Sequence, residues 1–276
     1  MTQLDQRTLD ASNAYIMEHP HESARLEGKT DPLRDRAQFE LIGLQPGMTV
    51  LDVGGGTGAV ARTMAEVVGP RGEVTVMDRS VERLRFGEAA AKRASISNIS
   101  FTCHDIMSAP FVRNHFDLVW SRFTFEYLSD PVAALTNLIQ YVRIGGKVVV
   151  ADLDGNGVVQ YPINPIVQHG TELLLKCVDG LFDPYVGRKL VHYFHTARLQ
   201  VGPVHVLPYH VYTGRAGAAD LENWTLKLQS LRPRCIPAFG SEHEYDRYAA
   251  EYLRQLTTPG VFMYSTLIIV EGTRVV

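Results

Sequence analysis

The chain has 276 residues, of which 45% are hydrophobic and 21% charged, so it is long enough for one large α/β domain with a buried core. Its formal net charge of −3 and pI of about 6.4 argue against a protein that binds nucleic acid through a basic surface. No apolar run approaches the roughly 18 residues that a membrane span needs, and residues 1–10 are polar. We therefore expect a cytoplasmic protein without membrane partners.

Residues 1–47 carry apolar side chains between charged ones at helical spacing, beginning with Tyr15, Ile16 and Met17. Pro20 and Pro32 divide this segment into short pieces. We expect an N-terminal helical flap here. Such a segment could exchange between protomers, so a homo-oligomer is one of the expected alternatives.

From Met48 onward, short Val-rich strands alternate with helical patterns. The expected strands are residues 49–53, 74–77, 99–103, 116–120 and 147–151. Strands that are apolar almost throughout are typical of a parallel sheet with helices on both faces. The sequence therefore predicts a three-layer αβα, doubly wound fold of the α/β class.

After Asp152 the helices become longer. Helices are expected at 165–177, 187–199, 220–231 and 242–256, and strands at 204–212 and 262–270. The last strand follows helices, so we expect it to insert beside its predecessor as an antiparallel strand in a mostly parallel sheet. Residues 48–276 then form a Rossmann-like domain with a helical cap insertion at about 213–258.

A loop with four glycines in residues 54–58 follows the first expected strand. Gly54, Gly56 and Ala59 satisfy the pattern G-x-G-x-x-G/A, so a nicotinamide- or flavin-dependent enzyme is one candidate. Glycines let the chain turn sharply and let the backbone approach a ligand closely. The loop alone does not separate the possible cofactors.

Acidic residues lie at three strand ends near this loop. Asp52 precedes the first glycine by two residues, Asp78 ends the second strand, and Asp105 follows the third. Asp52 can accept hydrogen bonds from loop amides or help to bind an ammonium group. Asp78 can bind both hydroxyls of a ribose, which NAD enzymes also require.

The pattern Asp52-x-Gly54-x-Gly56-x-Gly58 resembles the first signature of the class I S-adenosylmethionine (SAM)-dependent methyltransferases. The resemblance implies SAM as the cofactor, S-adenosylhomocysteine (SAH) as the product, and no metal. It also implies a carboxylate at the adenine amino group, an apolar contact with the adenine face, and polar groups at the methionine end. The cofactor-binding residues that it implies are Tyr15, Arg25, Asp52, Gly54, Gly56, Asp78, Arg79, Asp105, Ile106 and Ser121.

Further segments resemble a subgroup of small class I methyltransferases common in bacteria. Residues 13–15 together with Glu22 and Arg25 match its N-terminal pattern, and residues 151–154 and 183–190 match later signatures. Acceptors of this subgroup include quinone-like and natural-product scaffolds.

One position departs from the subgroup. Many relatives have cysteine where this chain has Gly55, and we expect the glycine to be tolerated.

The absence of motifs typical of nucleic-acid methyltransferases limits the classes of acceptor. Residues 121–124, Ser-Arg-Phe-Thr, replace the Asn/Asp-Pro-Pro-Tyr/Phe loop that holds an amino group on adenine, and no Pro-Cys pair for cytosine chemistry is present. Aromatic residues between the last two strands either cover an apolar pocket or simply pack the cap. We predict methylation of a small hydrophobic or aromatic metabolite. A nicotinamide oxidoreductase and a catalytically silent SAM-binding regulator are the alternatives.

Methyl transfer from a sulfonium depends mainly on alignment and on exclusion of water, so no catalytic side chain is identified. A base is needed only where the acceptor must lose a proton. Arg122, Tyr161 and His169 are the candidate acceptor contacts.

Two pairs of residues are candidate metal ligands. His192 and His195 lie one helical turn apart without an evident third ligand. Asp152 and Asp154 could bind magnesium, as acids near this sheet edge do in catechol methyltransferases. We expect no metal.

Overall fold

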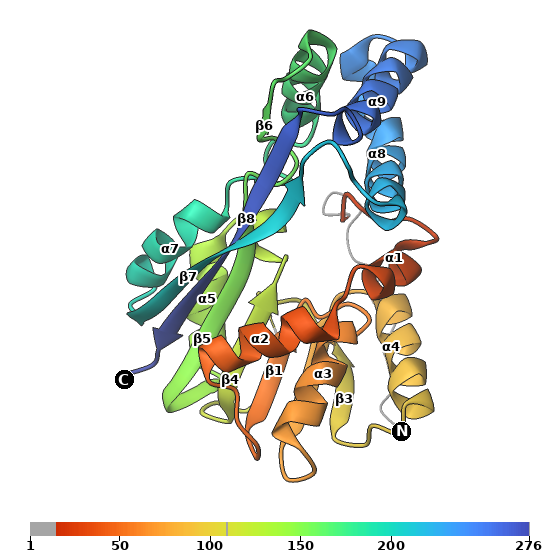
Figure 1. The fold of residues 1–276 in the computed structure, drawn as a ribbon. Helices are drawn as coiled ribbons and strands as arrows, with labels where there is room; N and C mark the ends of the chain where they lie inside the picture. Colours follow the sequence, from red (N-terminus) through yellow and green to blue (C-terminus); the bar gives the residue numbers. More distant parts are fainter. Residues whose placement is uncertain (1–14, 109, 276) are drawn as a thin grey trace.

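The computed structural model describes residues 15–108 and 110–275 and contains a sheet with helices on both faces (Figure 1). Asn13, Ala14 and the rest of residues 1–14 of the expected flap lie outside the described residues. The strands are β1 (Thr49–Val53), β2 (Glu73–Asp78), β3 (Ile99–Cys103), β4 (Phe116–Arg122), β5 (Val142–Asp154), β6 (Gln160–Tyr161), β7 (Gln200–Tyr212) and β8 (Phe262–Thr273). The predicted α/β sandwich is confirmed.

The strand order is β3-β2-β1-β4-β5-β8-β6, with β7 paired to β8. The pairs from β3 to β5 are parallel, and the order reverses at β1, which lies between β2 and β4. Val53 lies opposite Met77 on one side and opposite Ser121 on the other. The carboxyl ends of these strands therefore meet at the point where open α/β sheets bind ligands.

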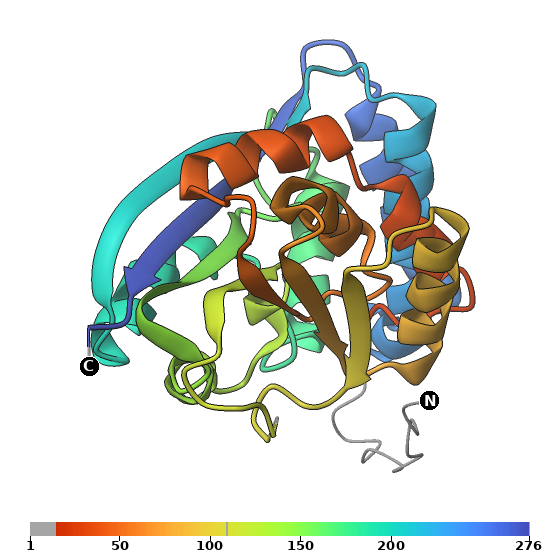
Figure 2. The ribbon, with the colours of Figure 1, turned by 90° about the horizontal axis from the view of Figure 1, so that it is seen from below.

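The last strand enters the sheet as predicted. β8 is antiparallel to β5, β6 and β7, and it lies between β5 and β7. Seen from below, β7 and β8 form the side of the sheet away from β3 (Figure 2). β6 was not predicted, because a two-residue strand carries no periodic signal.

Helices α2 (Pro32–Ile42), α3 (Ala59–Val68) and α4 (Val81–Arg93) cover one face of the sheet. Their buried contacts with the strands include Phe39, Met64, Leu84, Val50, Val76 and Val149. Successive strand residues face opposite sides, so Val50 of β1 belongs to this core and Leu51 to the other.

The opposite face is covered by α5 (Pro131–Ile139) and α7 (Leu190–Thr196), which follows the short helix η3 (Gly187–Lys189). The core on this side includes Leu51, Val119, Leu135, Val150 and Phe194, each at most 1% exposed. The two cores fix the sheet from both sides, so its carboxyl edge is a rigid support for a site.

The cap consists of α6 (Pro165–Cys177), α8 (Ala218–Phe239) and α9 (Glu242–Leu256), which lie together beyond that edge (Figure 1). α9 buries one face through Tyr245, Tyr248 and Tyr252. Of these three helices, only α8 and α9 belong to the insertion, which runs from the end of β7 to the start of β8, where Tyr212 pairs with Met263. It is therefore inserted into the turn of a hairpin.

The N-terminal part differs from its prediction. Helix α1 (Glu22–Gly28) and α2 are present, but residues 15–21 form turns and not a helix. Ile16 and Met17 are buried against the cap instead of lying along a helix. Their apolar character therefore reports a tertiary contact, and the helical interpretation of Tyr15 to Met17 was wrong.

Candidate active site

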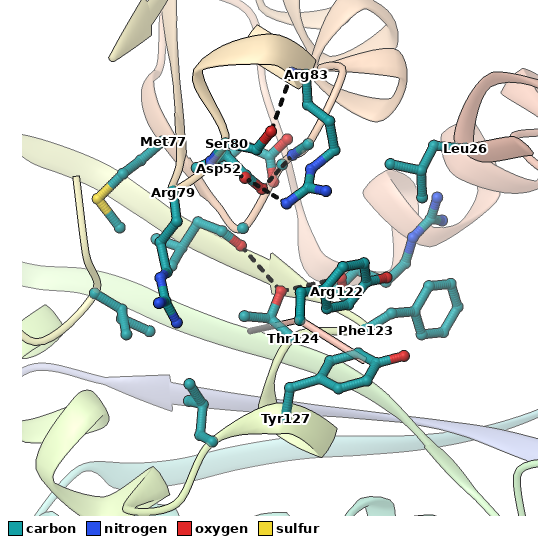
Figure 3. Close-up of a pocket in the computed structure, with 18 of the residues that line it drawn as sticks. Leu26, Asp52, Met77, Arg79, Ser80, Arg83, Arg122, Phe123, Thr124 and Tyr127 are labelled. Atoms are coloured by element: carbon teal, nitrogen blue, oxygen red, sulfur yellow. Dashed lines mark hydrogen bonds and ion pairs between the residues drawn. The ribbon is translucent and has the colours of Figure 1, made fainter. Parts of the chain in front are cut away.

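A cavity of about 480 Å³ lies at the carboxyl ends of β1, β2, β3 and β4. Figure 3 shows Asp52, Ser80 and Arg83 on one side of it and Tyr127 on the other. Residues 15–30, which we call the strap, supply further lining side chains, including Tyr15, Leu26 and Lys29. We call this space the first cavity.

The glycine loop forms part of its floor. Gly54, Gly56 and Gly58 have φ values of 69°, 56° and 66°, in the left-handed region that favours glycine. A Cβ on Gly54 would lie 2.3 Å from the hydroxyl oxygen of Thr124. The loop therefore needs glycine at Gly54 for both conformation and space.

Gly55 is required for a different reason. A Cβ there would lie 2.5 Å from Oδ2 of Asp52 and 2.8 Å from a methyl group of Val76. Glycine at this position therefore gives room to the buried carboxylate.

Asp52 lines the first cavity and is only 2% exposed. Burial raises its pKa to about 7, although the charge of Arg122 opposes the shift. Among the described residues, its Oδ2 has no hydrogen-bond partner. A buried acceptor without a partner is costly, so a ligand that donates a hydrogen bond here would stabilise the site.

Asp78 joins the glycine loop to the start of α4. One oxygen accepts a hydrogen bond from the Gly56 amide at 2.9 Å, and the other accepts one from the Ser80 amide at 2.8 Å. The Arg83 guanidinium lies 3.4 Å from the same carboxylate. Ser80 caps α4, because its hydroxyl accepts a hydrogen bond from the Arg83 amide.

Asp105 follows β3 and lines the same cavity. One of its oxygens accepts a hydrogen bond from the Met107 amide at 2.8 Å, and the other lies 3.4 Å from Nε of Arg79. The neighbouring Ile106 is 7% exposed and contributes an apolar wall.

The structure brings most of the predicted cofactor-binding residues together. Those that line the first cavity are Tyr15, Asp52, Gly54, Gly56, Asp78, Arg79, Asp105 and Ile106. Arg122, predicted as an acceptor contact, also lines it and pairs with Asp35 of α2 at 2.6 Å.

Two predicted cofactor-binding residues do not line it. Ser121 is fully buried and donates a hydrogen bond to the Val53 carbonyl at 3.0 Å. Arg25 contacts Glu22 at 2.7 Å, and the same carboxylate accepts a hydrogen bond from the Tyr15 hydroxyl. Arg25 therefore acts on the cavity through the position of Tyr15.

Two predicted acceptor contacts lie away from the first cavity. Tyr161 of β6 is 79% exposed, and His169 of α6 is also exposed. Neither side chain lines the first cavity or the smaller cavity beneath the cap.

The first cavity is also lined by residues that were not predicted from the sequence, among them Tyr127 and Lys29. Tyr127 belongs to the short helix η2 (Phe125–Tyr127), which directly follows the loop after β4. The sequence could have indicated Tyr127, because it follows the carboxyl end of β4, next to the point where the strand order reverses. Lys29 had no such signal, because it enters the cavity from the strap.

Lys29 is a cation that has no ion-pair partner among the described residues. Its ammonium lies 4.9 Å from the centre of the Phe123 ring. Burial and the nearby charges of Arg25 and Lys227 lower its pKa to about 7, which marks a place where negative charge would be stabilised.

A second, smaller cavity of about 70 Å³ lies beneath the cap. It shares Ile16 and Tyr127 with the first cavity, so these two side chains separate the two spaces. Most of its wall is apolar or aromatic and comes from the strap, α6, α8 and α9. Its polar lining residues are Tyr127, Asn156, Thr171, Lys227, Tyr248 and Tyr252.

The two candidate magnesium ligands, Asp152 and Asp154, form hydrogen bonds and an ion pair within the protein. Asp152 accepts hydrogen bonds from the amides of Glu126 and Leu153, and Asp154 binds Arg188 through two contacts. Within residues 15–108 and 110–275, no group of three or more His, Cys, Asp or Glu side chains is arranged to hold a metal. Over the same residues, no helix has the length and apolar character to cross a membrane.

Comparison with known proteins identifies the family. The model of a methyltransferase domain matches residues 44–206, which is more than half of the chain. A ubiquinone/menaquinone biosynthesis C-methyltransferase UbiE from Ectopseudomonas mendocina is 33% identical over 133 residues, covering 48% of this chain and 52% of that protein. The chain thus spans about half the length of the curated relatives it matches.

Solved structures share the fold. A putative methyltransferase from Bacillus halodurans has a TM-score of 0.60 at 15% identity, covering 87% of this chain and 99% of its own. A geranyl diphosphate methyltransferase in complex with SAM has a TM-score of 0.56 at 15% identity, covering 94% of each chain. The sheet order, the acid-lined cavity and the family match agree, and the chain belongs to the methyltransferase domain family, among the class I SAM-dependent methyltransferases.

Proposed function

We propose that this chain transfers the methyl group of SAM to a small, hydrophobic or aromatic metabolite. The observation that carries the proposal is the pair of adjoining cavities, one lined by strand-end carboxylates and the other mainly by apolar side chains. The first suits a polar, positively charged cofactor, and the second suits an apolar acceptor.

The residues present fit SAM. Asp78, Asp105 and Ile106 all line the first cavity, where Asp78 would bind the ribose hydroxyls and the other two would contact the adenine. The free oxygen of Asp52 offers an acceptor to the ammonium group. At the methionine end we assign Tyr15 and Lys29, since Ser121 and Arg25 do not line the cavity.

The protein's part in the reaction is alignment. Methyl transfer is an in-line displacement in which the acceptor atom approaches the methyl carbon opposite the sulfur. The strand ends on one side and the strap on the other would hold the cofactor, and the apolar cap would exclude water from the acceptor. Tyr127 lines both cavities and would therefore contact both reactants.

The relatives support an organic acceptor. Proteins that match this chain act in ubiquinone and menaquinone biosynthesis as C-methyltransferases or methylate geranyl diphosphate. The net charge of −3 supports a metabolite over a nucleic acid. A natural-product acceptor, the cytoplasmic location and a homo-oligomeric state remain predictions from the sequence.

Thermal unfolding with added cofactors tests the proposal. A ligand that binds only the folded state raises the melting temperature, so SAH should raise it and NAD should not. A rise with NAD or FAD and none with SAH would identify an oxidoreductase instead.

A label-transfer assay separates an enzyme from a silent SAM-binding regulator. The protein with methyl-labelled SAM should label small molecules in a cell extract. Label found only in protein or RNA contradicts the acceptor class, and SAH binding without any turnover favours the regulator.

A further inference from the structure

Lys227 is a cation in an apolar place. It belongs to α8 and lines the second cavity, where its ammonium nitrogen lies 4.3 Å from the centre of the Trp224 ring. Among the described residues it has no hydrogen-bond or ion-pair partner. The Trp224 ring attracts this cation but does not neutralise its charge, so a ligand that brings negative charge would be stabilised there.

Asn156 supplies a second unsatisfied group in the same cavity. It is 8% exposed, and its amide nitrogen donates to Glu126 at 3.0 Å. Its carbonyl oxygen, Oδ1, is buried and has no partner among the described residues. This oxygen needs a hydrogen-bond donor, which a carboxylate or a fully ionised phosphate cannot provide.

The positive charge of Lys227 and the unpaired oxygen of Asn156 together favour a ligand that can both donate a hydrogen bond and carry negative charge. A hydroxyl on an aromatic ring can donate a hydrogen bond, and once ionised it carries one negative oxygen. The rest of the wall suits the ring. Its apolar and aromatic members include Met17, Leu174, Phe182, Trp224, Leu228 and Tyr252.

The surroundings of Lys227 keep part of its side-chain amine in the neutral form. Burial is the main cause that lowers its pKa to about 8, and the nearby Arg25 lowers it further. A lysine with such a pKa is partly neutral near neutral pH and can accept a proton. The charged and titratable groups that act on it are Glu22, Arg25, Lys29, Glu126 and His210.

We propose that the second cavity binds an acceptor with a phenolic hydroxyl, and that Lys227 ionises this hydroxyl for methyl transfer. The inference rests on the proposed function. The neutral Lys227 amine takes the hydroxyl proton, and the electron pair of the O–H bond stays on oxygen. That oxygen then bonds to the methyl carbon while the carbon–sulfur bond breaks and its pair moves to sulfur. The products are a methyl ether, SAH and the Lys227 ammonium.

The test uses 4-nitrophenol, whose phenolate has a visible absorption band. The full-length protein is saturated with SAH, and the ionisation of bound 4-nitrophenol is followed by absorbance as a function of pH. We expect the bound probe to ionise about one pH unit lower than the free probe, a tenfold change in its ionisation equilibrium. In Lys227→Met this downward shift should be lost.

Two further variants control the test. Lys227→Arg keeps the positive charge, so it should retain the downward shift. Lys176→Met removes an exposed lysine of α6 that lines neither cavity, and it should behave as the unsubstituted protein does. SAH binding measured by calorimetry shows that each variant is folded.

The outcomes separate the inference from the proposed function. Failure of the unsubstituted protein to bind SAH contradicts the proposed function. If SAH binds but 4-nitrophenol does not, or if Lys227→Met retains the shift, the role of Lys227 is overturned. Tighter binding of 4-nitrobenzoate than of 4-nitrophenol would also overturn it, because the cavity would then select a carboxylate.

Discussion

Asp78 has two tasks in the first cavity, since it orders the glycine loop and, in the proposed complex, binds the ribose. We expect Asp78→Asn to weaken SAH binding about tenfold or more, because an amide cannot accept hydrogen bonds with both of its heavy atoms. Isothermal titration with SAH measures the change.

The matched control for this prediction is Glu88→Gln, which makes the same carboxyl-to-amide change at an exposed position of α4. It should leave SAH affinity unchanged. Equal affinities for Asp78→Asn and the unsubstituted protein would remove Asp78 from the site.

The raised pKa of Asp52 makes stability depend on pH. This carboxyl has a pKa of about 7 in the folded protein, against about 4 in an unfolded chain. Between these values the folded state holds a proton that the unfolded state has released, so the free energy of unfolding falls as pH rises through this window. In Asp52→Asn the fall should be smaller by on the order of 2 kcal/mol.

Urea unfolding of the ligand-free protein at several pH values from 4 to 8 provides the measurement. Asp179→Asn, at an exposed position, is the control and should follow the unsubstituted protein. Parallel curves for Asp52→Asn and the unsubstituted protein would mean that Asp52 is ionised throughout this range.

At the residue scale, the strand-end acids were predictable and the lysines were not. Asp52, Asp78 and Asp105 follow strands whose carboxyl ends must converge in a parallel sheet. Lys29 and Lys227 reach the cavities from the strap and the cap, and only tertiary packing places them there. Ser121 was expected in the cavity but turns into the sheet, because alternate strand residues face opposite sides.

The cap helices pack too closely to accept a larger side chain at Gly170. A Cβ on this residue of α6 would lie 2.1 Å from the ring of Tyr248 in α9. We expect Gly170→Ala to lower the free energy of unfolding by about 1–3 kcal/mol, because the ring must move within a packed cluster.

Chemical denaturation measures this loss. Gly28→Ala is the control, because a Cβ on Gly28 at the end of α1 meets nothing within 4 Å. That variant should be as stable as the unsubstituted protein or slightly more stable. A similar loss in both variants would mean that the α6–α9 contact is not the cause.

The strap is tied to the body of the protein by ion pairs. Glu18 binds Arg83 at 2.8 Å, and this contact lies at the wall of the first cavity. We expect Glu18→Gln to speed SAH dissociation about two- to fivefold with little change in melting temperature, because a half-exposed pair contributes about 0.2–1 kcal/mol. Stopped-flow displacement of SAH measures the rate.

Glu66→Gln is the matched control, since it breaks the exposed pair between Glu66 of α3 and Arg36 of α2, away from the strap. Its dissociation rate should equal that of the unsubstituted protein. An unchanged rate in Glu18→Gln would show that the strap does not limit release.

At the element scale, strong periodic patterns predicted their helices well. α6 was predicted at residues 165–177 and α9 at 242–256, and both are observed there. α8 was expected to end near Leu231 but continues past Pro233 and Pro237. Buried contacts of Cys235 and Phe239 with the rest of the cap outweigh the cost of proline in a helix.

At the scale of the whole molecule, the fold depends on its last strand. β8 pairs with β5, β6 and β7, and its Leu267, Ile269 and Val270 are at most 1% exposed. We expect removal of residues 264–276 to prevent folding, because the edges of β5 and β7 would lose their partner. Near-ultraviolet circular dichroism and size-exclusion chromatography test this.

Removal of residues 275 and 276 alone is the comparison, since Val275 is 50% exposed and lies beyond β8. That protein should fold and bind SAH. A folded, monodisperse protein without residues 264–276 would contradict the central role of β8.

The cap's insertion in a hairpin turn has a consequence for how such enzymes diversify. Every residue that lines the first cavity precedes residue 182, and the family match ends at 206, whereas much of the second cavity comes from α8 and α9. Exchange of the stretch between Tyr212 and Met263 would therefore alter which metabolite is methylated, while the residues that line the first cavity stay the same.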